Sequence, residues 1–585
     1  MLKRTHTCGE LSEIDTEQTV VLNGWVNKWR DHGGLIFIDL RDRFGVTQIV
    51  FDPSVNKEIY LTAKKLRSEF VVAVKGKVEM RPDDSFNPSI STGKIEILAR
   101  EIEVLNESKT PPFEISDNID INEELGLTYR YLSLRRQKLQ QNLILRSRLY
   151  QSVREYLTKN SFVEIETPVL MKSTPEGARD FLVPSRNYKG KFYALPQSPQ
   201  TYKQLLMVAG FDRYFQIVKC FRDEDLRRDR QPEFTQIDME MSFVDENDVM
   251  TIADGLIRKI FKDIHGIDIS TPIKKMSFQQ AFETYGNDKP DLRFDMQIRK
   301  LNNLFKQTDF QVFKDVLSQN GHIAGLAIPD GSELPRNRID RLVEEAKNYG
   351  ANGLAYMKYQ KNEFSAGISK FISDVEKKNI REAFPLKEND LLIMVAGKYE
   401  MVYSVLGQLR LDLGQELKLS DNSQIRFIWI VDFPLLEFSD EENRYVARHH
   451  PFTSPKPDQI DLLSEKPQEV LARAYDLVLN GNEIAGGSIR INTRKMQRKM
   501  FEALKISKEE AENKFGFLMK ALDFGAPPHG GIAFGLDRLA MILAGGDSIR
   551  DVIAFPKTSS GLSLMDQAPS EVDNVQLREL HLKIL

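Results

Sequence analysis

The stretch "FRDEDLRRDRQPEFTQID", Phe221 to Asp238, places four arginines and six carboxylates within eighteen residues. The residues that lead into it, "DRYFQIVKCF", are typical of a strand, and after Pro232 the pattern again favours a strand. The stretch therefore predicts a β-hairpin with a highly charged loop. A solvated turn is one interpretation of that loop. A phosphate site is the other, because arginine binds phosphate through parallel charge-assisted hydrogen bonds.

The bulk composition is that of an ordinary globular protein. The 585 residues are enough for several domains, with 41% hydrophobic and 28% charged residues. The net charge of −4 gives no global basic field, although a large enzyme can bind RNA through one local face. The N-terminus lacks a signal pattern, and no apolar run is long enough to span a membrane. We expect a cytoplasmic protein without membrane association.

The two cysteines, Cys8 and Cys220, are far apart in the sequence. They cannot build a disulfide framework or a zinc site of the usual spacing. The "HTC" at His6 to Cys8 could hold a metal only with ligands from elsewhere in the chain. This cysteine usage fits a reducing cytoplasm.

The first hundred residues contain five runs with strand-like alternation. In the first of them, Val20, Leu22 and Val26 share one parity, and in the fourth Phe70, Val72, Val74, Val78 and Met80 do so. A helical stretch, "SVNKEIYLTAKKLRSE", separates the third run from the fourth. This order predicts a small five-stranded oligonucleotide-binding barrel. The runs are "TVVLNGWV", "GLIFIDLRD", "GVTQIVFD", "EFVVAVKGKVEM" and "GKIEILAREIEVL".

Beyond a polar, proline-containing linker at 106–118, the pattern changes to mixed helices and strands. "QNLILRSRLYQSVREYLTKN" has helical spacing, and "FVEIETPVL" resembles a strand stopped by Pro168. "QSPQTYKQLLMVAG" predicts a helix with Ser198 as N-cap, Pro199 at its first position and Gly210 as its end. The strand "GGIAFGL" leads into the helix "DRLAMILAGG". The sequence pattern of residues 286–421 indicates a separate α+β insertion. It has few clustered ionisable groups that could do chemistry.

Two further clusters suggest a phosphate site. "RAYDLVLNGNEIAGGSIRI" holds Asp476, Glu483 and Arg490, and two carboxylates with an arginine suit Mg²⁺ and phosphate. In "GLDRL", Arg538 falls in the first turn of an apolar helix, where an anion is favoured. Each cluster alone could equally be an ion pair, a helix cap or a tight turn. Together with the charged hairpin they predict a nucleoside triphosphate site, although the chain has no GxxxxGK[ST] motif.

Across essentially its whole length, the chain resembles the bacterial-type aspartyl-tRNA synthetases, a class II aminoacyl-tRNA synthetase family. "FVEIETPVLMKSTPEGARDF" resembles the family's dimer-interface motif and substrate loop. "FRDEDLRRDRQPEFTQIDMEM" resembles the second class II motif, and "GLDRL" resembles the third. The segments "QSPQTYKQLLM", "ARHHPFT" and "GNEIAGGSIRI" are similar to stretches specific to the aspartyl branch.

The resemblance implies a multidomain α/β (α+β) protein that forms a homodimer. An N-terminal OB-fold barrel would bind the anticodon, an antiparallel class II sheet would carry catalysis, and the insertion would match one shared with an amidotransferase subunit. The expected parts are the barrel at 1–107, a hinge at 108–140, the catalytic domain at 141–285 and 422–560, the insertion at 286–421 and a C-terminal extension at 561–585.

The implied reaction joins L-aspartate to the 3′ end of tRNA(Asp), using ATP and Mg²⁺. Arg222 would grip the α-phosphate and the aspartate carboxylate, Arg538 the γ-phosphate, and Asp476 with Glu483 the metal. Glu224 would contact ATP, and the loop 225–230 would meet the acceptor end of the tRNA. The implied catalytic residues are Arg222, Glu224 and Arg538. The implied ATP-binding residues are Arg222, Asp223, Glu224, Gln231, Phe234, Glu483, Gly535, Leu536, Asp537 and Arg538.

Aspartate selection would depend on a cation pair, Lys203 and Arg490, with Asp238 holding Lys203 in place. We expect unpaired cations in this pocket to reject an uncharged amide, by roughly 10⁴ on the analogy of hydrogen-bonding pockets. His449 would be a substrate contact on a mobile loop. The full implied aspartate-binding set is Glu176, Ser198, Gln200, Lys203, Arg222, Asp238, His449 and Arg490.

The barrel would read the anticodon by stacking and by edge hydrogen bonds. Phe37 matches the aromatic that stacks on a base, although a lone phenylalanine is more often barrel core. His32 matches family members that charge both tRNA(Asp) and tRNA(Asn), whereas Asp84 fits neither the permissive nor the selective pattern. Because an imidazole can donate or accept, we expect measurable aspartylation of tRNA(Asn). The groups expected to read neighbouring base edges are Arg30, Gln48 and Glu96.

Three other functions remain open at this point. A class II synthetase for asparagine or lysine would share the core, but the cation pair and the insertion argue against it. An ammonia-dependent asparagine synthetase would lack the barrel. A non-catalytic RNA-binding or amidotransferase-associated protein would not need Arg222, Glu483 and Arg538.

Overall fold

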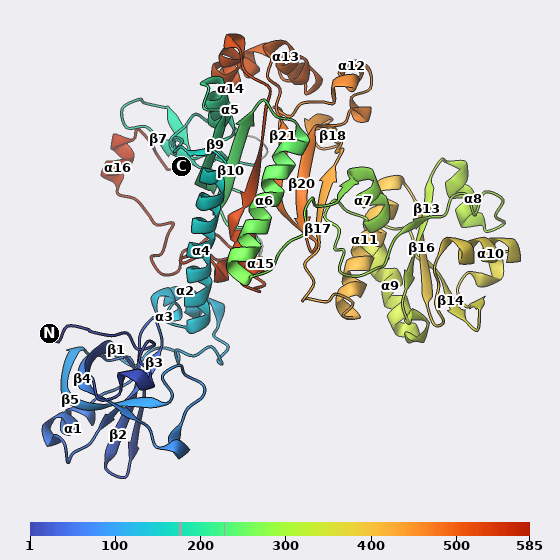
Figure 1. Cartoon of the computed structure of the whole chain (residues 1–585). Helices are drawn as coiled ribbons and strands as arrows, with labels where there is room; N and C mark the ends of the chain where they lie inside the picture. The colour runs from blue at the N-terminus through green and yellow to red at the C-terminus, as the bar shows by residue number, and fades with distance from the viewer. Residues whose placement is uncertain (175–177, 227–228, 585) are drawn as a thin grey trace. The chain divides into compact units, whose positions relative to one another are not determined.

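The computed structural model describes residues 1–174, 178–226 and 229–584 (Figure 1). The chain divides into two compact units, one of Met1–Arg146 with Arg550–Ser570 and one of Ser147–Ile549 with Glu571–Leu585. Among the described residues, no helix combines the length and apolarity needed to cross a bilayer.

The first unit contains the predicted barrel. Its five strands close in the order β1-β2-β3-β5-β4, with β3 and β5 parallel, which confirms the oligonucleotide-binding fold. Alternate residues point inward, so Val20, Leu22 and Val26 are fully buried, whereas Met80, expected inside, ends its strand 47% exposed. The elements are β1 (Thr19–His32), β2 (Leu35–Arg41), β3 (Val46–Phe51), α1 (Lys57–Ala63), β4 (Val71–Met80), β5 (Ile95–Asn106), α2 (Glu123–Thr128) and α3 (Arg130–Ser133), with the 3₁₀ turns η1 (Glu13–Asp15) and η2 (Asp83–Ser85).

An eight-stranded sheet forms the centre of the second unit. Its order is β11-β17-β20-β21-β22-β10-β9-β6. The six central strands pair antiparallel with one another, and the two edge strands pair parallel with their neighbours. The predicted hairpin is confirmed, because Phe221 of β9 pairs with Glu233 of β10. The strands are β6 (Val163–Glu164), β9 (Arg213–Phe221), β10 (Glu233–Ser242), β11 (Lys275–Ser277), β17 (Phe427–Val431), β20 (Ala474–Leu479), β21 (Asn482–Ile489) and β22 (His529–Gly535).

Two sequence-based expectations in this unit are wrong in their extent. The strand expected to run up to Pro168 is only β6, Val163–Glu164, at the edge of the sheet. Helix α5 (Gln200–Val208) begins one residue later than expected, with Pro199 at the cap position. The Ser198 hydroxyl still accepts a hydrogen bond from the amide of Gln200 at 3.2 Å, so the serine caps the first turn from one residue further out.

Helices and short hairpins surround the sheet. Helix α15 follows β22 directly, which places Arg538 in its first turn as predicted. The helices are α4 (Gln137–Lys159), α6 (Glu246–His265), α7 (Phe278–Tyr285), α12 (Leu462–Glu465), α13 (Arg494–Ala503), α14 (Lys508–Ala521), α15 (Leu536–Leu543) and α16 (Asn574–Glu579). The hairpin strands are β7 (Leu182–Pro184) with β8 (Phe192–Ala194) and β18 (Leu436–Ser439) with β19 (Arg444–Ala447).

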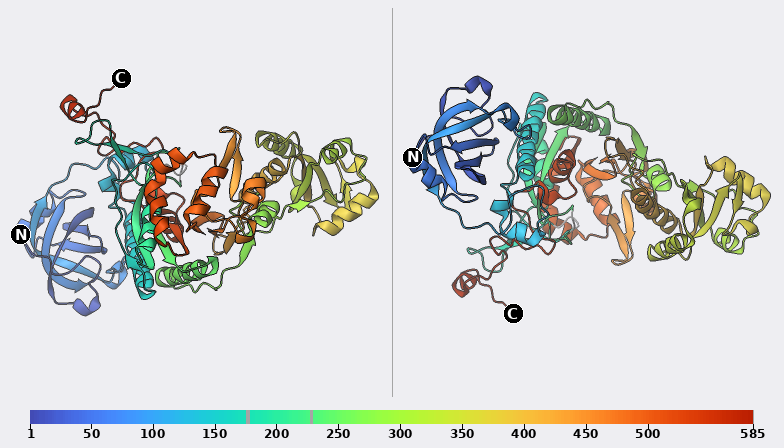
Figure 2. Two further views of the ribbon diagram at one scale, coloured as in Figure 1. Left: turned by 90° about the horizontal axis from the view of Figure 1, so that it is seen from above. Right: turned by 90° about the horizontal axis from the view of Figure 1, so that it is seen from below.

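A second sheet lies between β11 and β17 in the chain (Figure 2). Its five strands are antiparallel in the order β12-β13-β16-β14-β15, packed with helices α8 to α11. The elements are β12 (Arg299–Lys300), α8 (Gln311–Ser318), β13 (His322–Ile328), α9 (Arg336–Asn348), β14 (Ala355–Gln360), β15 (Glu363–Ser365), α10 (Asp374–Ala383), β16 (Leu391–Gly397) and α11 (Tyr399–Glu416).

Candidate active site

Two connected cavities open over β9, β10, β20, β21 and β22. The larger has a volume of about 530 Å³ and the smaller about 370 Å³. They adjoin each other, because some of the same side chains line both. These shared residues are Arg222, Glu224, Gln236, Glu483 and Ala533.

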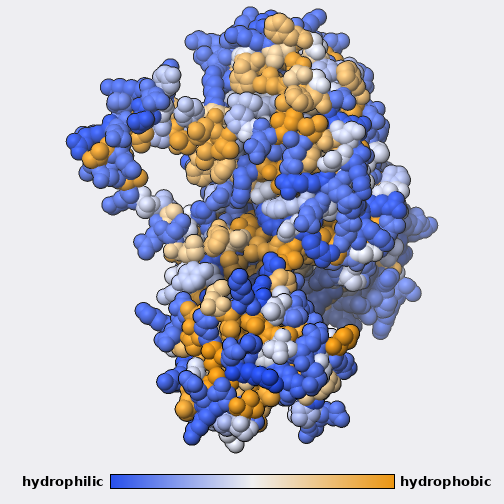
Figure 3. Space-filling model, turned by 60° about the vertical axis from the view of Figure 1, so that its left-hand side comes forward, coloured by the Kyte–Doolittle hydropathy of each residue, from blue (hydrophilic) through white to orange (hydrophobic). Residues whose placement is uncertain are grey.

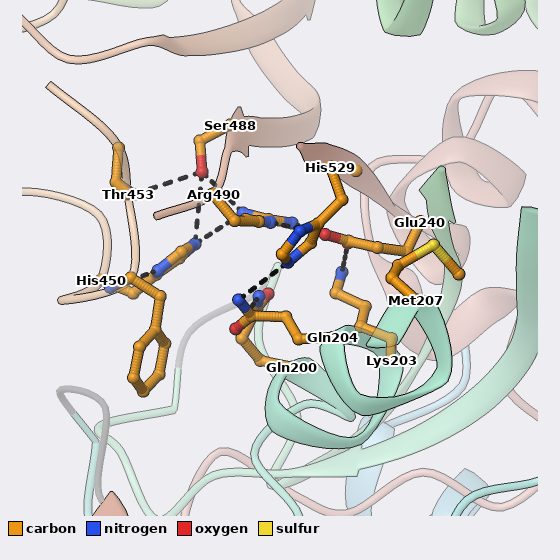
Figure 4. A network of polar contacts seen from close by, with 12 residues as sticks. Gln200, Lys203, Gln204, Met207, Glu240, His450, Thr453, Ser488, Arg490 and His529 are labelled. Carbon is orange, nitrogen blue, oxygen red and sulfur yellow. Dashed lines mark hydrogen bonds and ion pairs between the residues drawn. The ribbon is translucent and has the colours of Figure 1, made fainter. Parts of the chain in front are cut away.

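A buried charge cluster forms one wall of the larger cavity (Figure 4). Lys203 Nζ lies 2.5 Å from Asp238 Oδ1 and 3.3 Å from Glu240 Oε2. Arg490 donates two hydrogen bonds to Glu240, of 2.9 and 3.1 Å. Asp238 contacts Lys203 as expected, and because Glu240 pairs with both Lys203 and Arg490, neither cation is unpaired. Burying a charge without a partner costs far more than burying a pair, so each cation has a carboxylate beside it.

Glu240 was missed by the sequence analysis although it joins the two cations. It is fully buried, and burial opposes its ionisation, but Arg490 and Lys203 outweigh burial and hold its pKa below the ordinary value. A side chain at Gly531 would approach Glu240 Oε2 to 2.0 Å, so only glycine fits there. Because Asp238 and Glu240 are two residues apart on one strand, they share a face, and this spacing could have revealed Glu240.

Two histidines adjoin this charge cluster, His450 in the cavity lining and fully buried His529. His450 Nε2 lies 2.7 Å from Arg490 Nη1, which also donates to the Ser488 hydroxyl at 2.6 Å. Burial, reinforced by Arg490, lowers the pKa of His450 far below the ordinary value, so the ring is neutral. His529 contacts the Gln204 amide at 3.2 Å, and its pKa is likewise lowered by burial (Figure 4).

Asp476 and Glu483 converge on the space in front of Gly486. A methyl group on Gly486 would meet Asp476 Oδ1 at 2.7 Å and Glu483 Oε1 at 3.6 Å. Asp476 Oδ1 is buried without a hydrogen-bond partner among the described residues, and His449 Nε2 lies 3.7 Å from it. Burial raises the pKa of Asp476, and the charges of Glu483 and Asp288 add to this rise.

These carboxylates fit Mg²⁺, which takes few protein carboxylates and keeps waters and phosphate oxygens. Within the described residues, no group of three or more His, Cys, Asp or Glu side chains is arranged to enclose a metal by itself. A metal held here would therefore share its ligands with a bound phosphate.

Arginines and an aromatic ring line the smaller cavity. The Arg222 guanidinium lies 5.0 Å from the centre of the Phe234 ring, and buried Gln231 lines the same space. Arg538 donates to the Glu483 carbonyl at 2.5 Å and to Asp229 at 3.0 Å. Glu224 accepts a hydrogen bond from Arg230 at 2.9 Å. Opposite charges therefore hold one another in place around a space open to an anionic ligand.

The structure brings most of the expected residues together, with specific exceptions. Ser198, Gln200 and His449 line the larger cavity, and Gly535 and Asp537 the smaller. Leu536 is fully buried in the core, and exposed Asp223 lies 3.8 Å from Arg179, so neither lines a cavity. Asp537 also accepts a hydrogen bond from the Thr235 amide at 2.7 Å, which ties α15 to β10. Glu176, Arg227 and Arg228 lie outside the described residues.

The expected anticodon residues lie on one face of the barrel. Arg30 donates to Asp39 at 3.0 and 2.7 Å and to Gln48 at 3.0 Å. Gln48 in turn donates to Glu96 at 2.7 Å, and burial raises the pKa of Glu96. Phe37 is opposite Arg30 in the sheet register. The sequence analysis missed Asp39, which holds Arg30 in this row.

The residues expected to discriminate between tRNAs lie at the end of a barrel strand and in a 3₁₀ turn. His32 ends β1 and its ring meets Phe37 edge-on, with ring centres 5.8 Å apart. Asp84 is exposed in η2, where it accepts a hydrogen bond from the Ser85 hydroxyl at 3.3 Å. Both side chains are accessible to a ligand on the barrel surface.

Comparison with known proteins agrees with this geometry. Residues 122–559 match the family model "tRNA synthetases class II (D, K and N)", and residues 20–105 match "OB-fold nucleic acid binding domain". The Aspartate--tRNA(Asp/Asn) ligase of Caldanaerobacter subterraneus subsp. tengcongensis is 54% identical over 100% of this chain and 98% of its own length. The Aspartate--tRNA ligase of Macrococcus caseolyticus is 51% identical over 100% of this chain and 99% of its own length.

Solved structures share the fold at low sequence identity. The aspartyl-tRNA synthetase of Entamoeba histolytica has a TM-score of 0.59 at 19% identity, covering 95% of this chain and 91% of that one. The asparaginyl-tRNA synthetase of Pyrococcus horikoshii, complexed with asparaginyl-adenylate, has a TM-score of 0.57 at 20% identity, covering 95% and 99%. With a class II family model matched over most of its length and relatives above 50% identity along all of it, the chain belongs to the class II tRNA synthetases.

Proposed function

We propose that this chain is an aspartate–tRNA ligase, which activates L-aspartate with ATP and transfers it to tRNA(Asp). The observation that carries the proposal is the pairing of the two cavities. A cation pair suited to a carboxylate, Lys203 and Arg490, lines a space that shares Arg222 and Glu483 with an arginine-rich cavity. The names of relatives identical at 51–54% point to the same activity.

In the first step, an oxygen of the aspartate α-carboxylate attacks the α-phosphorus of ATP. The bond to the β-phosphate breaks, pyrophosphate leaves and aspartyl-adenylate forms. Negative charge builds on the phosphates, so positioning and electrostatic stabilisation carry most of the catalysis. Because all three line the smaller cavity, we assign Arg222 to the α-phosphate, Arg538 to the terminal phosphate and Phe234 to stacking on the adenine. Glu224 keeps Arg230 oriented beside the nucleotide.

Asp476 and Glu483 would hold Mg²⁺, which neutralises phosphate charge when it is bound. Their convergence near Gly486 and the unpartnered oxygen of Asp476 support this assignment. In the second step, the terminal ribose hydroxyl of the tRNA attacks the adenylate carbonyl and AMP leaves.

Selection of aspartate follows from the wall built by Lys203 and Arg490. A side-chain carboxylate entering the cavity meets donors whose positions are fixed by Asp238, Glu240 and His450. An amide would present hydrogen-bond donors to these donors, and a buried mismatch of that kind costs binding energy. Ser198, Gln200 and Glu176 are assigned to the substrate amino group and His449 to closure over it.

The barrel is assigned to the anticodon, with Phe37 stacking on one base and Arg30, Gln48 and Glu96 facing its neighbours. tRNA(Asn) is included as a second substrate because His32 can donate or accept a hydrogen bond. The tRNA substrates place the reaction in the cytoplasm. We retain the division into barrel, hinge, split catalytic domain, insertion at 286–421 and C-terminal extension.

A homodimer is part of the proposal. Large apolar side chains are exposed around β6, β7 and β8, among them Val163, Leu170, Leu182 and Phe192. Apolar patches interrupt the hydrophilic surface on the face shown in Figure 3. Such patches on one protein commonly mark a contact with another protein. Light scattering of the purified protein should give twice the 67.2 kDa chain mass.

Aspartate-dependent exchange of pyrophosphate into ATP tests the first step. The wild-type protein should exchange with aspartate and far less with asparagine or lysine. Exchange that depends on asparagine or lysine would move the chain to another branch of the family. If none of the three amino acids supports exchange, the proposed adenylate-forming activity is refuted.

A further inference from the structure

We propose that Lys289, at the start of the inserted segment, binds the β- and γ-phosphates of ATP and the pyrophosphate that leaves. The inference rests on the proposed function and assigns a residue to the phosphate end of that site. The inserted segment would then take a direct part in the chemistry. Its sequence did not suggest this role, because it has few clustered ionisable groups.

The position of Lys289 carries the argument. Its Nζ lies 3.2 Å from Glu483 Oε2, and its side chain lines the cavity that also holds Arg222, Arg230 and Arg538. The side chain is 46% exposed, so it can turn without opening the core. A flexible ammonium with three donors is a good ligand for a phosphate oxygen.

The carboxylate that Lys289 contacts is the one assigned to Mg²⁺. The ammonium lies 3.2 Å from Glu483 Oε2, whereas the Glu483 oxygen on the side of Gly486 and Asp476 is Oε1. A metal held at Oε1 would take up part of the negative charge of this carboxylate and weaken its attraction for the ammonium. The phosphate chain arrives with the metal and is the nearest new source of negative charge for Lys289.

The backbone around Lys289 is held while its side chain stays free to move. The Lys289 amide donates to the Asn287 side chain at 2.8 Å, and Asp288 pairs with Arg448 at 3.3 Å. On the other side, the Asp291 carbonyl accepts a hydrogen bond from Arg410 at 2.8 Å. The fully buried Arg410 belongs to α11, so the insertion itself fixes the point from which Lys289 reaches the cavity.

Binding measurements on the whole protein test the role of Lys289. Calorimetric titration with Mg²⁺ and a β,γ-methylene analogue of ATP is compared with titration by AMP, which lacks the β- and γ-phosphates. Lys289→Ala should weaken binding of the analogue about tenfold, as expected for one charged hydrogen bond, and change AMP binding less than twofold. Lys289→Arg should restore most of the affinity for the analogue.

Lys347→Ala is the matched control, because Lys347 forms an exposed ion pair with Glu344 at 2.8 Å on α9 of the same inserted segment. It should bind both ligands like the wild type. Unchanged or tighter binding of the analogue by Lys289→Ala would overturn the proposal, because Lys289 would then only neutralise Glu483. Equal weakening for AMP would also overturn it, since the effect would not concern the outer phosphates.

The outcome is separable from that of the proposed function. Wild-type protein that lacks aspartate-dependent exchange would refute the aspartate–tRNA ligase assignment. Wild-type protein that exchanges normally, together with Lys289→Ala that binds the analogue normally, would refute only the role of Lys289. A wild-type protein that binds neither the analogue nor AMP would refute both.

Discussion

At the scale of single residues, we propose that the first step depends most on Arg222. It lines both cavities, and its guanidinium lies over the Phe234 ring. Arg222→Ala should reduce aspartate-dependent exchange by at least about 10²-fold, the loss typical for one group that stabilises developing charge. Thermal unfolding should be nearly unchanged, because an exposed cation–π contact contributes only about 0.5–1 kcal/mol. Exchange close to the wild-type rate in this variant would refute the phosphate role.

Arg490 and Glu240 should give different results when changed. Arg490→Leu should mainly raise the KM for aspartate in the exchange reaction and affect the KM for ATP less. The substitution should also lower the free energy of unfolding, because Lys203 would then be the only one of the two cations still paired with the buried Glu240 carboxylate. Removing one partner of a buried pair costs about 3–5 kcal/mol. A larger effect on ATP than on aspartate would reverse the assigned roles.

Glu240→Gln is the matched change on the carboxylate side. It keeps the size of the side chain but leaves two buried cations with Asp238 as their only remaining carboxylate within the cluster of described residues. The free energy of unfolding should fall by an amount comparable to that for Arg490→Leu, measured by denaturant titration. Because the pKa of Glu240 is held low, its contribution is present above the unfolded-state pKa and is lost as pH falls through the lower folded-state pKa. A variant as stable as the wild type at neutral pH would contradict the paired cluster.

Sequence patterns identified the charged groups of this site better than their partners. Arg222, Lys203, Arg490 and Arg538 could be recognised because each lies in a long, distinctive motif. Glu240 was missed because its partners are 37 and 250 residues away in the chain. The sequence shows that a charge is present, but only the folded sheet shows which opposite charge neutralises it.

At the scale of elements, the barrel face should affect tRNA but not the adenylate step. Phe37 is half-buried on the outward side of β2, whereas its neighbour Ile38 is fully buried. Phe37→Ala should slow charging of tRNA(Asp) about tenfold or more, because stacking one base is worth about 1–3 kcal/mol. Its rate of pyrophosphate exchange should stay at the wild-type level. Equal losses in both assays would show that Phe37 is structural.

Ile38→Ala is the comparison for that change. It removes buried apolar volume from the barrel core and should cost about 2–5 kcal/mol of stability. Phe37→Ala should cost much less, as measured by denaturant unfolding of each variant. Comparing the free energies of unfolding of the two variants distinguishes the loss of a tRNA contact from destabilisation of the barrel.

The loop that ends β1 should influence the choice between two tRNAs. His32 is exposed and packs edge-on against Phe37, so it is accessible to a neighbouring base. His32→Leu should shift the ratio of kcat/KM values toward tRNA(Asp) and away from tRNA(Asn), because leucine cannot hydrogen-bond either base edge. Wild-type charging of tRNA(Asn) thousands of times less efficient than that of tRNA(Asp) would contradict the assigned role of His32.

Elements with a clear period were predictable, and short ones were not. The five barrel strands follow their alternating patterns, and the β9–β10 hairpin follows from the strand-like flanks of its charged loop. Strand β6 is only two residues long because it pairs at the sheet edge over Val163 and Glu164 alone. Local alternation in "FVEIETPVL" cannot show how far a neighbouring strand accompanies it.

At the scale of the whole molecule, the active site draws on segments far apart in the chain. Lys203 and Arg222 come from one side of the insertion in sequence, and Glu483, Arg490 and Arg538 from the other. Asp288 and Lys289, at the start of the insertion, reach the same cavities. The sequence predicted that the catalytic sheet is split, but the contribution of Lys289 is visible only when these segments are brought together.

The measurement that tests the central claim most directly is aminoacylation of purified tRNA(Asp), with aspartate, asparagine and lysine offered separately. tRNA(Asn) is assayed beside it under the same conditions. We predict that aspartate is esterified to tRNA(Asp) in an ATP-dependent reaction, with measurable transfer to tRNA(Asn), and that neither other amino acid is attached efficiently. Attachment of asparagine or lysine in preference to aspartate, or ATP-dependent adenylate formation without any transfer to tRNA(Asp), would contradict the assignment of this chain as an aspartate–tRNA ligase.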